Sequence, residues 1–336
     1  MTRSALIIGG DGQIGRAVAR NLLSHGWHVR LTKHSPGPPA PDLAGHVETI
    51  ICDRDAPDAL AALLTGGADA VIDTVAFTEA HARQWIDLSG DIGALAVIST
   101  ISLYCDDEGR TMDQAQGTGF PAFPVPITED QPTVAPGPAT YATRKAGMEQ
   151  LLLEKARCPV TLLRPGAIHG EGSRQPREWW FIKRILDGRR RIPLAYDGRS
   201  IFPTSATANI AELCRIALEQ PATRILNAVD PEPLTISDIG TAIAAVYGVD
   251  LDLTQLAGPP RELVGEHPWC VPAPVVMDMS RAEALGYRPV TRYRDTIAGV
   301  CRSAEAVAAT GIAFPDYLSL RYFDYAAEDA TLSSVG

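Results

Sequence analysis

Tyr141 and Lys145 form a Tyr-x-x-x-Lys pair, a spacing that places a phenol and an ammonium on one face of a helix. Only four lysines occur in the chain, so chance placement gives about 0.1 such pairs. A neighbouring ammonium and an oxidised nicotinamide ring both favour phenolate, so we expect the pKa of Tyr141 to be lowered. Such a phenol exchanges a proton with an alcohol or carbonyl while hydride moves to or from the nicotinamide. Taken alone, the pair would fit a solvated face of an amphipathic helix.

Ser99 and Thr100 follow a predicted strand over 95–99, at the edge where open α/β sheets hold their ligands. Thr100 can donate a hydrogen bond to the substrate oxygen that Tyr141 protonates. Ser99 or Ser102 could take the same role. A serine or threonine that merely ends the strand is the structural alternative.

A glycine-rich turn, Gly9-Gly10-Asp11-Gly12-Gln13-Ile14-Gly15, lies between a predicted strand over 4–8 and a predicted helix over 14–24. Glycine permits positive φ and close approach of the backbone to a ligand. The helix start presents N–H groups and the positive end of its dipole to a pyrophosphate. The run fits both Gly-x-Gly-x-x-Gly and Gly-x-x-Gly-x-x-Gly. In this position it predicts nucleotide binding rather than a purely structural turn.

The residue that reads the adenosine ribose is expected about 20 residues further on, at the end of the second strand. No carboxylate lies there, and the chain offers Lys33 and His34 instead. These residues favour the 2′-phosphate of NADP over NAD, although a solvated basic strand end is the alternative. Asp53, after the third strand, is placed either to meet the adenine amino group or to cap a helix.

The elements that must position these residues alternate between strands and helices over the first hundred residues. This rhythm predicts an α/β fold with a doubly wound parallel sheet. Residues 106–138 are rich in proline and glycine and predict a long irregular loop of the kind that forms lids or binding segments. Predicted strands lie at 28–32, 47–52, 70–75, 160–163 and 224–228, and predicted helices at 58–64, 83–89, 141–155, 179–186, 208–219 and 236–246.

Composition excludes several classes of function. The net charge of −10 disfavours nucleic acid as a partner, and 46% hydrophobic residues provide for a sizeable core. No apolar run approaches the length of a membrane span, so we expect a soluble, cytoplasmic protein without a membrane partner. The six cysteines are widely spaced and form no Cys-x-x-Cys, so we expect reduced thiols and no metal.

In combination these motifs resemble the extended short-chain dehydrogenase/reductase family, in its NAD-dependent epimerase/dehydratase branch. The matching order is the glycine turn, Asp53, Ser99–Thr100 with Tyr104, Thr128–Glu129–Asp130, the Tyr141/Lys145 pair, and Leu163–Arg164–Pro165 with Gly170. The resemblance covers roughly residues 4–240. It implies a Rossmann domain over 1–168, to which elements at about 203–228 return. It also implies a smaller C-terminal substrate-binding lobe over 169–202 and 229–325, before a tail over 326–336 that we expect to be frayed.

The resemblance also implies a Thr100–Tyr141–Lys145 catalytic set, with Lys145 holding the nicotinamide ribose. The residues assigned to coenzyme binding are Gly9, Gly12, Gln13, Ile14, Gly15, Lys33, His34, Asp53, Val75, Ala76, Phe77, Ser99, Tyr141, Lys145, Pro165 and Ile168. Candidate substrate contacts are Ser102, His169, Trp179, Trp180 and Arg199. Arg199 is shifted relative to the pattern of sugar-nucleotide enzymes, which argues against a nucleoside-diphosphate sugar. The basic run Arg189–Arg191 is interpreted as a solvated helix end rather than an anion grip.

These observations predict an NADP-dependent oxidoreductase that acts on a small or medium carbonyl or alcohol. A first alternative is a sugar-nucleotide epimerase or dehydratase that uses the same residues with a tightly bound NAD(P). A second is a dinucleotide-sensing protein without turnover, which would have no use for a tuned phenol. The resemblance further implies a homodimer with a small-molecule substrate as its ligand.

Overall fold

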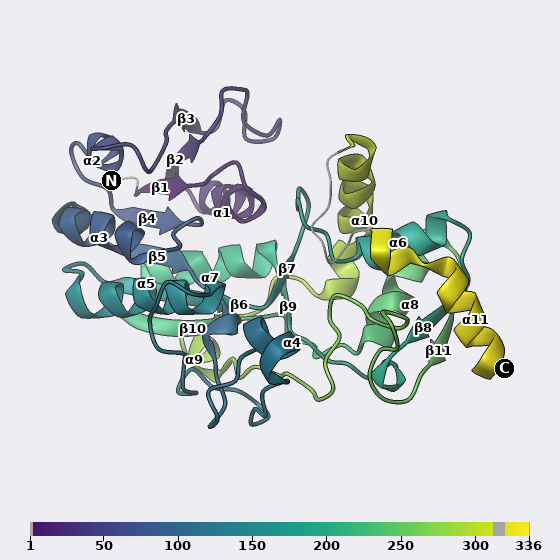
Figure 1. Ribbon diagram of the computed structural model, residues 1–336. Coiled ribbons are helices and arrows are strands. Elements are labelled where there is room, and N and C mark those ends of the chain that lie inside the picture. The colour runs from purple at the N-terminus through teal and green to yellow at the C-terminus, as the bar shows by residue number, and fades with distance from the viewer. Residues whose placement is uncertain (1–2, 312–319, 336) are drawn as a thin grey trace. The chain divides into compact units, whose positions relative to one another are not determined.

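A computed structural model describes residues 3–311 and 320–335, and the chain divides into two compact units. Unit 1 holds residues 1–166, 207–229 and 277–290. Unit 2 holds residues 167–206, 230–276 and 291–336. The elements of both are labelled in Figure 1. Within the described ranges, no helix is both long and apolar enough to cross a membrane.

Unit 1 is built on a seven-stranded parallel sheet with the strand order β10-β6-β5-β4-β1-β2-β3. The order runs outward from β1 in both directions, which confirms the doubly wound topology. Between β1 and β4, Ile7 pairs with Ile72, and between β1 and β2 it pairs with Leu31. The strands are β1 (Ser4–Ile8), β2 (His28–Lys33), β3 (Glu48–Ile51), β4 (Ala70–Asp73), β5 (Leu95–Ile98), β6 (Val160–Pro165) and β10 (Arg224–Ala228).

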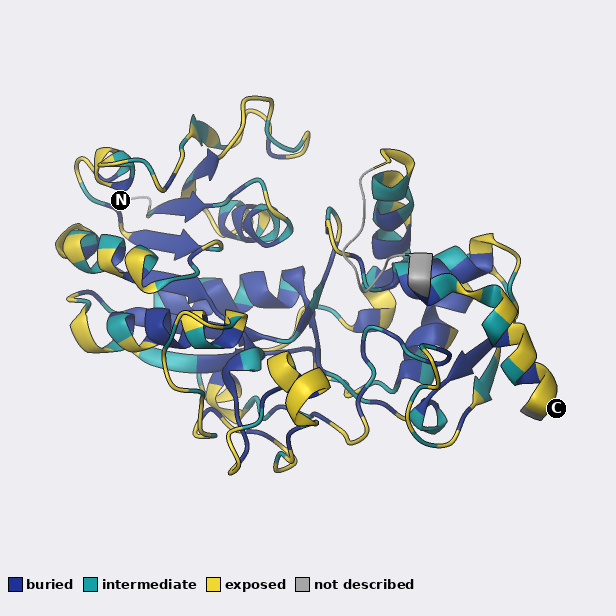
Figure 2. Ribbon diagram, viewed as in Figure 1, coloured by how far each residue is buried: buried dark blue, intermediate teal, exposed yellow. Residues whose placement is uncertain are grey.

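Helices cover both faces of this sheet. On one face α3 packs against α5, and their core includes Trp85, Met148 and Leu152 over Leu6 of β1. On the other face α1 packs against α7. Figure 2 shows the inner strands β1, β4 and β5 as almost wholly buried, whereas the edge strand β3 is partly exposed. The helices of unit 1 are α1 (Gln13–Ser24), α2 (Ala59–Leu63), α3 (Glu79–Leu88), α4 (Ala115–Thr118), α5 (Tyr141–Lys155), α7 (Thr207–Glu219) and α9 (Ser280–Ala284).

A capping box fixes the start of α5, and with it the position of Tyr141. The Thr143 N–H donates to Thr140 Oγ1 at 3.2 Å, and the Thr140 N–H donates to Thr143 Oγ1 at 3.0 Å. These two bonds satisfy backbone donors that the first turn of a helix leaves open. Tyr141 is therefore the first residue of α5, and Lys145 lies one turn further on the same face.

Unit 2 has its own core around Trp180, Phe181, Trp269 and Tyr293. It contains two short parallel pairs, β7 with β9 and β8 with β11. Helices α6, α8 and α10 pack against one another over this core. The elements are β7 (Ala167–His169), α6 (Trp179–Leu186), β8 (Arg191–Leu194), β9 (Thr204–Ala206), α8 (Ile236–Tyr247), β11 (Asp252–Gln255), α10 (Tyr293–Ala309) and α11 (Tyr325–Val335).

The structure corrects three expectations about the organisation of the chain. The tail is helical rather than frayed up to residue 335, because Glu328 of α11 is buried and pairs with Arg184 of α6; residue 336 lies outside the described residues. Residues 277–290 belong to unit 1 rather than to the lobe, since α9 packs on β10 and Arg281 lies 2.6 Å from Asp130. Strand β9 belongs to unit 2, because it pairs with β7.

Candidate functional site

The glycine turn connects β1 to α1, and the structural requirement for glycine differs between its positions. Gly9 has a φ of +77°, and a Cβ there would lie 2.5 Å from Thr74 Oγ1. A Cβ on Gly15 would lie 2.5 Å from the Gly9 carbonyl oxygen, so Gly15 lets α1 pack closely on the turn. Gly12 has an ordinary φ of −74°, and among the described atoms its Cβ would meet only the Gly9 oxygen, at 3.3 Å. Gly12 therefore leaves room for a group from outside the protein.

The N-terminus of α1 fits an anionic ligand. Its capping residue, Gly12, provides no side-chain hydrogen bond, and its first turn has no acidic residue. Helices α5 and α8 are instead capped by Thr140 and Thr235. Gln13 Oε1 and Ser99 Oγ are buried polar atoms without a hydrogen-bond partner among the described residues. Open backbone donors, the helix dipole and unpaired polar atoms together fit a dinucleotide with its pyrophosphate on α1.

Lys33 closes β2 with a buried ammonium. Its Nζ donates to the carbonyl oxygens of Gly37 at 3.1 Å and Pro38 at 2.7 Å. It also lies 3.9 Å from the carboxylate of Asp11, which comes from the glycine turn. His34, the next residue, is exposed. A positive charge therefore lies at the end of β2, as predicted. The Lys33 ammonium binds the turn at Gly37 and Pro38, and the sequence argument did not consider the nearby carboxylate of Asp11.

Asp53 is exposed at the carboxyl end of β3, where a residue facing adenine is expected. Its Oδ1 accepts the backbone N–H of Asp55 at 3.0 Å. The residue at the start of α2 is Asp58, so Asp53 does not cap that helix. The alternative of a helix cap is thus wrong, and contact with the coenzyme stays a prediction.

Tyr141 and Thr100 lie together in unit 1. The Tyr141 side chain is 43% exposed, and the Thr100 side chain lies close enough to its phenol to lower the pKa of that phenol. Thr100 Oγ1 donates to Ser102 Oγ at 3.1 Å, which makes a short row of hydroxyls. The ring of Phe77 stacks on the ring of Tyr141, with centroids 5.4 Å apart and planes at 29°. The phenol, the threonine and the serine named from the sequence are therefore neighbours.

The ammonium of Lys145 lies at the carboxyl ends of β4 and β5. Its Nζ donates to the carbonyl oxygens of Ala76 at 2.7 Å and Ile98 at 2.8 Å. Burial lowers the pKa of Lys145 to about 8, against the opposing influence of the negative charges of Asp73 and Glu149. The ammonium is thus held next to the strand ends without a direct carboxylate partner in the described hydrogen bonds.

The expected lowering of the Tyr141 pKa by Lys145 is not found. Burial raises the pKa of Tyr141, the hydrogen bond with Thr100 lowers it, the charge of Asp113 raises it, and the net direction is upward. The reason is that Lys145 is engaged with backbone carbonyls rather than with the phenol. Tyr141 therefore carries its proton at neutral pH, as a proton donor must.

Asp73, at the end of β4, is a residue that the sequence argument missed. Its Oδ1 accepts the N–H groups of Val75 and Ala76 at 2.9 and 2.8 Å. Its Oδ2 accepts from Arg54 Nη1 at 2.5 Å and Trp85 Nε1 at 2.6 Å. Asp73 is fully buried, so this carboxylate shapes the segment that presents Val75, Ala76 and Phe77. A carboxylate ending an otherwise apolar strand was the available signal.

A second buried ion pair, which the sequence argument also missed, joins α5 to β6. Arg164 of β6 donates to both carboxylate oxygens of Glu149, at 3.1 and 2.5 Å. Its guanidinium lies 4.8 Å from the centroid of the Tyr104 ring, and the Tyr104 hydroxyl donates to Asn227 at 2.7 Å. The Arg164 and Tyr104 positions of the family pattern are therefore structural in unit 1, and Pro165 directly follows Arg164.

The candidate substrate residues of unit 2 are less accessible than expected. His169 is buried, its Nε2 lies 2.7 Å from Asp230 Oδ2, and its ring packs against Tyr293. Trp180 is a core residue and not a pocket wall, because it is fully buried against Phe181. The remaining substrate candidates of unit 2 are more accessible, since Trp179 is half-buried and Arg199 is exposed. Ile168, which is predicted to contact the coenzyme, is also half-buried.

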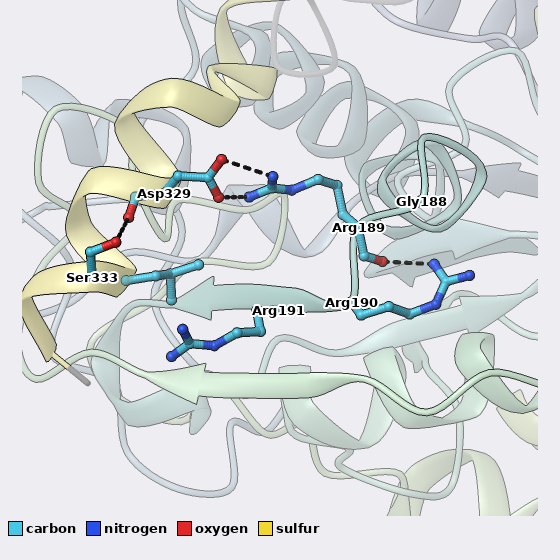
Figure 3. A pocket seen from close by; sticks show the side chains of 7 residues that line it. Gly188, Arg189, Arg190, Arg191, Asp329 and Ser333 are labelled. Atoms are coloured by element: carbon cyan, nitrogen blue, oxygen red, sulfur yellow. Dashed lines mark hydrogen bonds and ion pairs between the residues drawn. The ribbon is translucent and has the colours of Figure 1, made fainter.

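The basic run Arg189–Arg191 lines a shallow surface pocket beside α11 (Figure 3). Arg189 pairs with Asp329 of α11, and Arg191 Nε lies 3.0 Å from Asp252. Arg190 donates to two backbone carbonyls. The protein's own acceptors engage all three guanidinium groups, which favours the structural interpretation over an anion grip.

Comparison with known proteins agrees with this geometry. The model of the NAD-dependent epimerase/dehydratase family matches residues 5–228. UDP-glucose 4-epimerase from Thermotoga maritima, solved with UDP-glucose, is 15% identical, with a TM-score of 0.67 over 91% of this chain and 99% of that one. UDP-glucuronic acid 4-epimerase from Bacillus cereus, solved with UDP-glucuronic acid and NAD, is 19% identical, with a TM-score of 0.66 over 90% and 99%.

A putative epimerase from Burkholderia cenocepacia is 21% identical, with a TM-score of 0.68 over 91% of this chain and 98% of that one. At these identities the likeness to solved structures shows the fold alone. No curated protein sequence matches the chain. The family match spans well over half of the chain and contains the glycine turn, Thr100, Tyr141 and Lys145. The chain therefore belongs to the NAD-dependent epimerase/dehydratase family of extended short-chain dehydrogenases/reductases.

Proposed function

We propose that this protein is an NADP-dependent oxidoreductase that moves hydride between nicotinamide and a small or medium carbonyl or alcohol. One observation carries the proposal: the phenol of Tyr141 lies beside the Thr100 side chain, in the same unit where Lys145 Nζ binds the Ala76 and Ile98 carbonyls at the ends of β4 and β5. A proton donor and an oxygen-orienting hydroxyl thus share the sheet edge that binds ligands in this class of fold.

The coenzyme is held by the residues that fit it. The turn at Gly12 and the open N-terminus of α1 would hold the pyrophosphate, and Gln13 and Ser99 have polar atoms that lack partners among the described residues and would be available to it. Lys145 would hold the nicotinamide ribose, as the family resemblance implies. The bound nicotinamide supplies the hydride chemistry, for which side chains have no equivalent.

The chain's own residues provide proton transfer and orientation. The raised pKa of Tyr141 keeps the phenol protonated at neutral pH, so it can donate to a carbonyl oxygen that becomes a hydroxyl. The Ser102 N–H donates to Thr100 Oγ1 at 3.1 Å and positions this hydroxyl, which donates to Ser102 Oγ at 3.1 Å. A substrate oxygen would replace Ser102 Oγ as the acceptor of the Thr100 proton.

Coenzyme choice rests on the end of β2. The strand ends in Lys33 and the exposed His34 rather than in a carboxylate, which favours a 2′-phosphate, and Lys33 Nζ must share its protons with the Gly37 and Pro38 carbonyls. Asp11 opposes this, because its carboxylate lies 3.9 Å from Lys33 Nζ. We expect NADPH to bind at least several-fold more tightly than NADH. Lys33→Asp should reduce this difference in affinity, and Asp11→Asn should increase it. Titration calorimetry with both coenzymes measures the two affinities.

A second candidate is a sugar-nucleotide epimerase or dehydratase that retains its coenzyme through the cycle. It is favoured by the family match and by neighbours whose names describe UDP-sugar epimerases. The two functions differ in stoichiometry, since an oxidoreductase consumes added NADPH and an epimerase does not. Protein purified with bound dinucleotide that interconverts UDP-sugars without net consumption would replace the first proposal with the second.

The deciding experiment compares coenzyme binding with turnover on a panel of aldehydes, ketones and alcohols. Tyr141→Phe should leave NADPH affinity within about two-fold and lower turnover by roughly 10²- to 10⁴-fold, the usual size of a general acid's contribution. Tyr196→Phe, the same change in unit 2, is the matched control and should have no effect. A Tyr141→Phe variant with unchanged turnover would remove the assigned role of the phenol.

We also propose that the protein is a homodimer in the cytoplasm with a small molecule as substrate. The support is the family resemblance of the sequence. Sedimentation velocity tests the assembly, and a monomer at micromolar concentration would contradict it.

A further inference from the structure

Phe77 occupies a fixed place beside the proposed proton donor. It follows β4 and directly precedes Thr78, the residue that caps α3. Its ring stacks on that of Tyr141 at 5.4 Å and 29°, within the range for an attractive offset pair. The guanidinium of Arg144 also lies near this ring, 5.8 Å from the Phe77 centroid. The Phe77 ring therefore covers one side of the Tyr141 ring, while Thr100 lies beside the phenol.

Hydrogen bonds fix the backbone at each of residues 75–77, the segment that ends in Phe77. Asp73 accepts the N–H groups of Val75 and Ala76, and Lys145 binds the Ala76 carbonyl. The N–H of Phe77 donates to Nδ1 of His81 at 2.9 Å. These hydrogen bonds fix the backbone from which the Phe77 ring extends toward Tyr141.

The hydrogen bond from Phe77 requires neutral His81. An acceptor at Nδ1 places the ring proton on Nε2, which lies 3.1 Å from Asp55 Oδ1 and donates to it. Burial lowers the pKa of His81, the charge of Arg54 lowers it further, and the charges of Asp55 and Asp73 act in the opposite direction. The net direction favours the neutral ring that Phe77 needs.

We propose that Phe77 is a positioning residue for Tyr141, and that His81 acts through Phe77 by holding its backbone N–H. The inference rests on the proposed function, because it assigns Tyr141 the role of proton donor. It adds a path from the loop after β3, through Asp55, His81 and Phe77, to the phenol. Stacking orients the phenol toward Thr100 and keeps water from one face of its ring.

The first test follows Tyr141 itself and needs no substrate. In protein with isotope-labelled tyrosine rings, Tyr141→Phe assigns the Tyr141 resonance, and a pH titration gives its ionisation. Phe77→Leu should remove the ring-current shift of Tyr141 and move its pKa down toward the ordinary value, whereas Phe77→Trp should retain both. Phe323→Leu, in unit 2, is the matched control. A Tyr141 resonance and pKa unchanged in Phe77→Leu would overturn the proposal.

The second test measures turnover and coenzyme affinity separately. Phe77→Leu should lower kcat by roughly 3- to 10-fold, the fold-change equivalent of one aromatic pair, with the KM for NADPH little changed. Phe77→Trp should restore kcat. A variant that loses only coenzyme affinity would show Phe77 to be a wall of the coenzyme site, and not a positioning residue. If no substrate is turned over, the proposed function fails, while the resonance test still decides the stacking.

His81 has its own matched pair of variants. Asparagine offers an acceptor oxygen close to the place of Nδ1, and leucine does not. We expect His81→Asn to keep the Tyr141 ring-current shift and His81→Leu to reduce it. Equal effects of both changes, with normal folding shown by circular dichroism, would contradict the role assigned to His81.

Discussion

Asp73→Asn tests the buried carboxylate that shapes the segment before α3. The amide retains Oδ1, which accepts from Val75 and Ala76, but it replaces Oδ2 with a donor that faces Arg54 and Trp85. Breaking a buried ion pair costs about 3–5 kcal/mol, because the partner charge is left unpaired. Since Oδ1 survives, we expect the lower end, about 3 kcal/mol of the free energy of unfolding.

Urea denaturation followed by circular dichroism measures this loss, with Asp87→Asn as the control because Asp87 is exposed on the same helix that contains Trp85. Combining Asp73→Asn with Arg54→Met removes the unpaired cation, so the double variant should cost at least about 1 kcal/mol less than the sum of the single variants. A loss below about 1 kcal/mol for Asp73→Asn, or strict additivity in the double variant, would refute the reasoning.

Three further predictions concern other parts of the molecule. Gly12→Ala should leave the melting temperature nearly unchanged and weaken dinucleotide binding in titration calorimetry. Gly15→Ala should lower the melting temperature of the apo-protein, because its Cβ would lie 2.5 Å from a carbonyl oxygen. A stable Gly15→Ala variant, or a Gly12→Ala variant that binds the dinucleotide normally, would contradict these roles. The pKa of Lys145 is about 8 when folded and 10.5 in its ordinary state, so the unfolded chain binds more protons between these values and stability should rise with pH across that window. This rise, about 3 kcal/mol at most, should be missing in Lys145→Met, and equal slopes in both proteins would be inconsistent with a buried ammonium. Glu328→Gln should destabilise unit 2 by about 3 kcal/mol by leaving Arg184 unpaired, and a loss no larger than that of an exposed carboxylate would show that α11 is not anchored.

The sequence was sufficient for the elements that carry strong local signals. Helix α5 runs from Tyr141 to Lys155 as predicted, since a capping threonine begins it and its spacing is regular. Strands β1 and β10 also match their predicted bounds. The row of Tyr141, Thr100 and Ser102 was foreseeable, because strand ends and helix starts meet at one edge of a parallel sheet.

Other features depend on contacts between distant segments, which local patterns do not encode. Helix α11 has a weakly amphipathic sequence, and its order comes from Glu328 meeting Arg184 of α6. Residues 277–290 return to unit 1 through Arg281 and Asp130. The carbonyl partners of Lys145 belong to two strand ends, so the helical spacing to Tyr141 gave no sign of them.

The most direct test of the account is an experimental structure of the protein with NADPH bound. The account predicts the pyrophosphate on the N-terminus of α1 beside Gly12, and the reactive face of the nicotinamide within reach of the hydroxyl of Tyr141. A nicotinamide bound away from Tyr141, or a wild-type protein that takes up neither NADPH nor NADH, would contradict it.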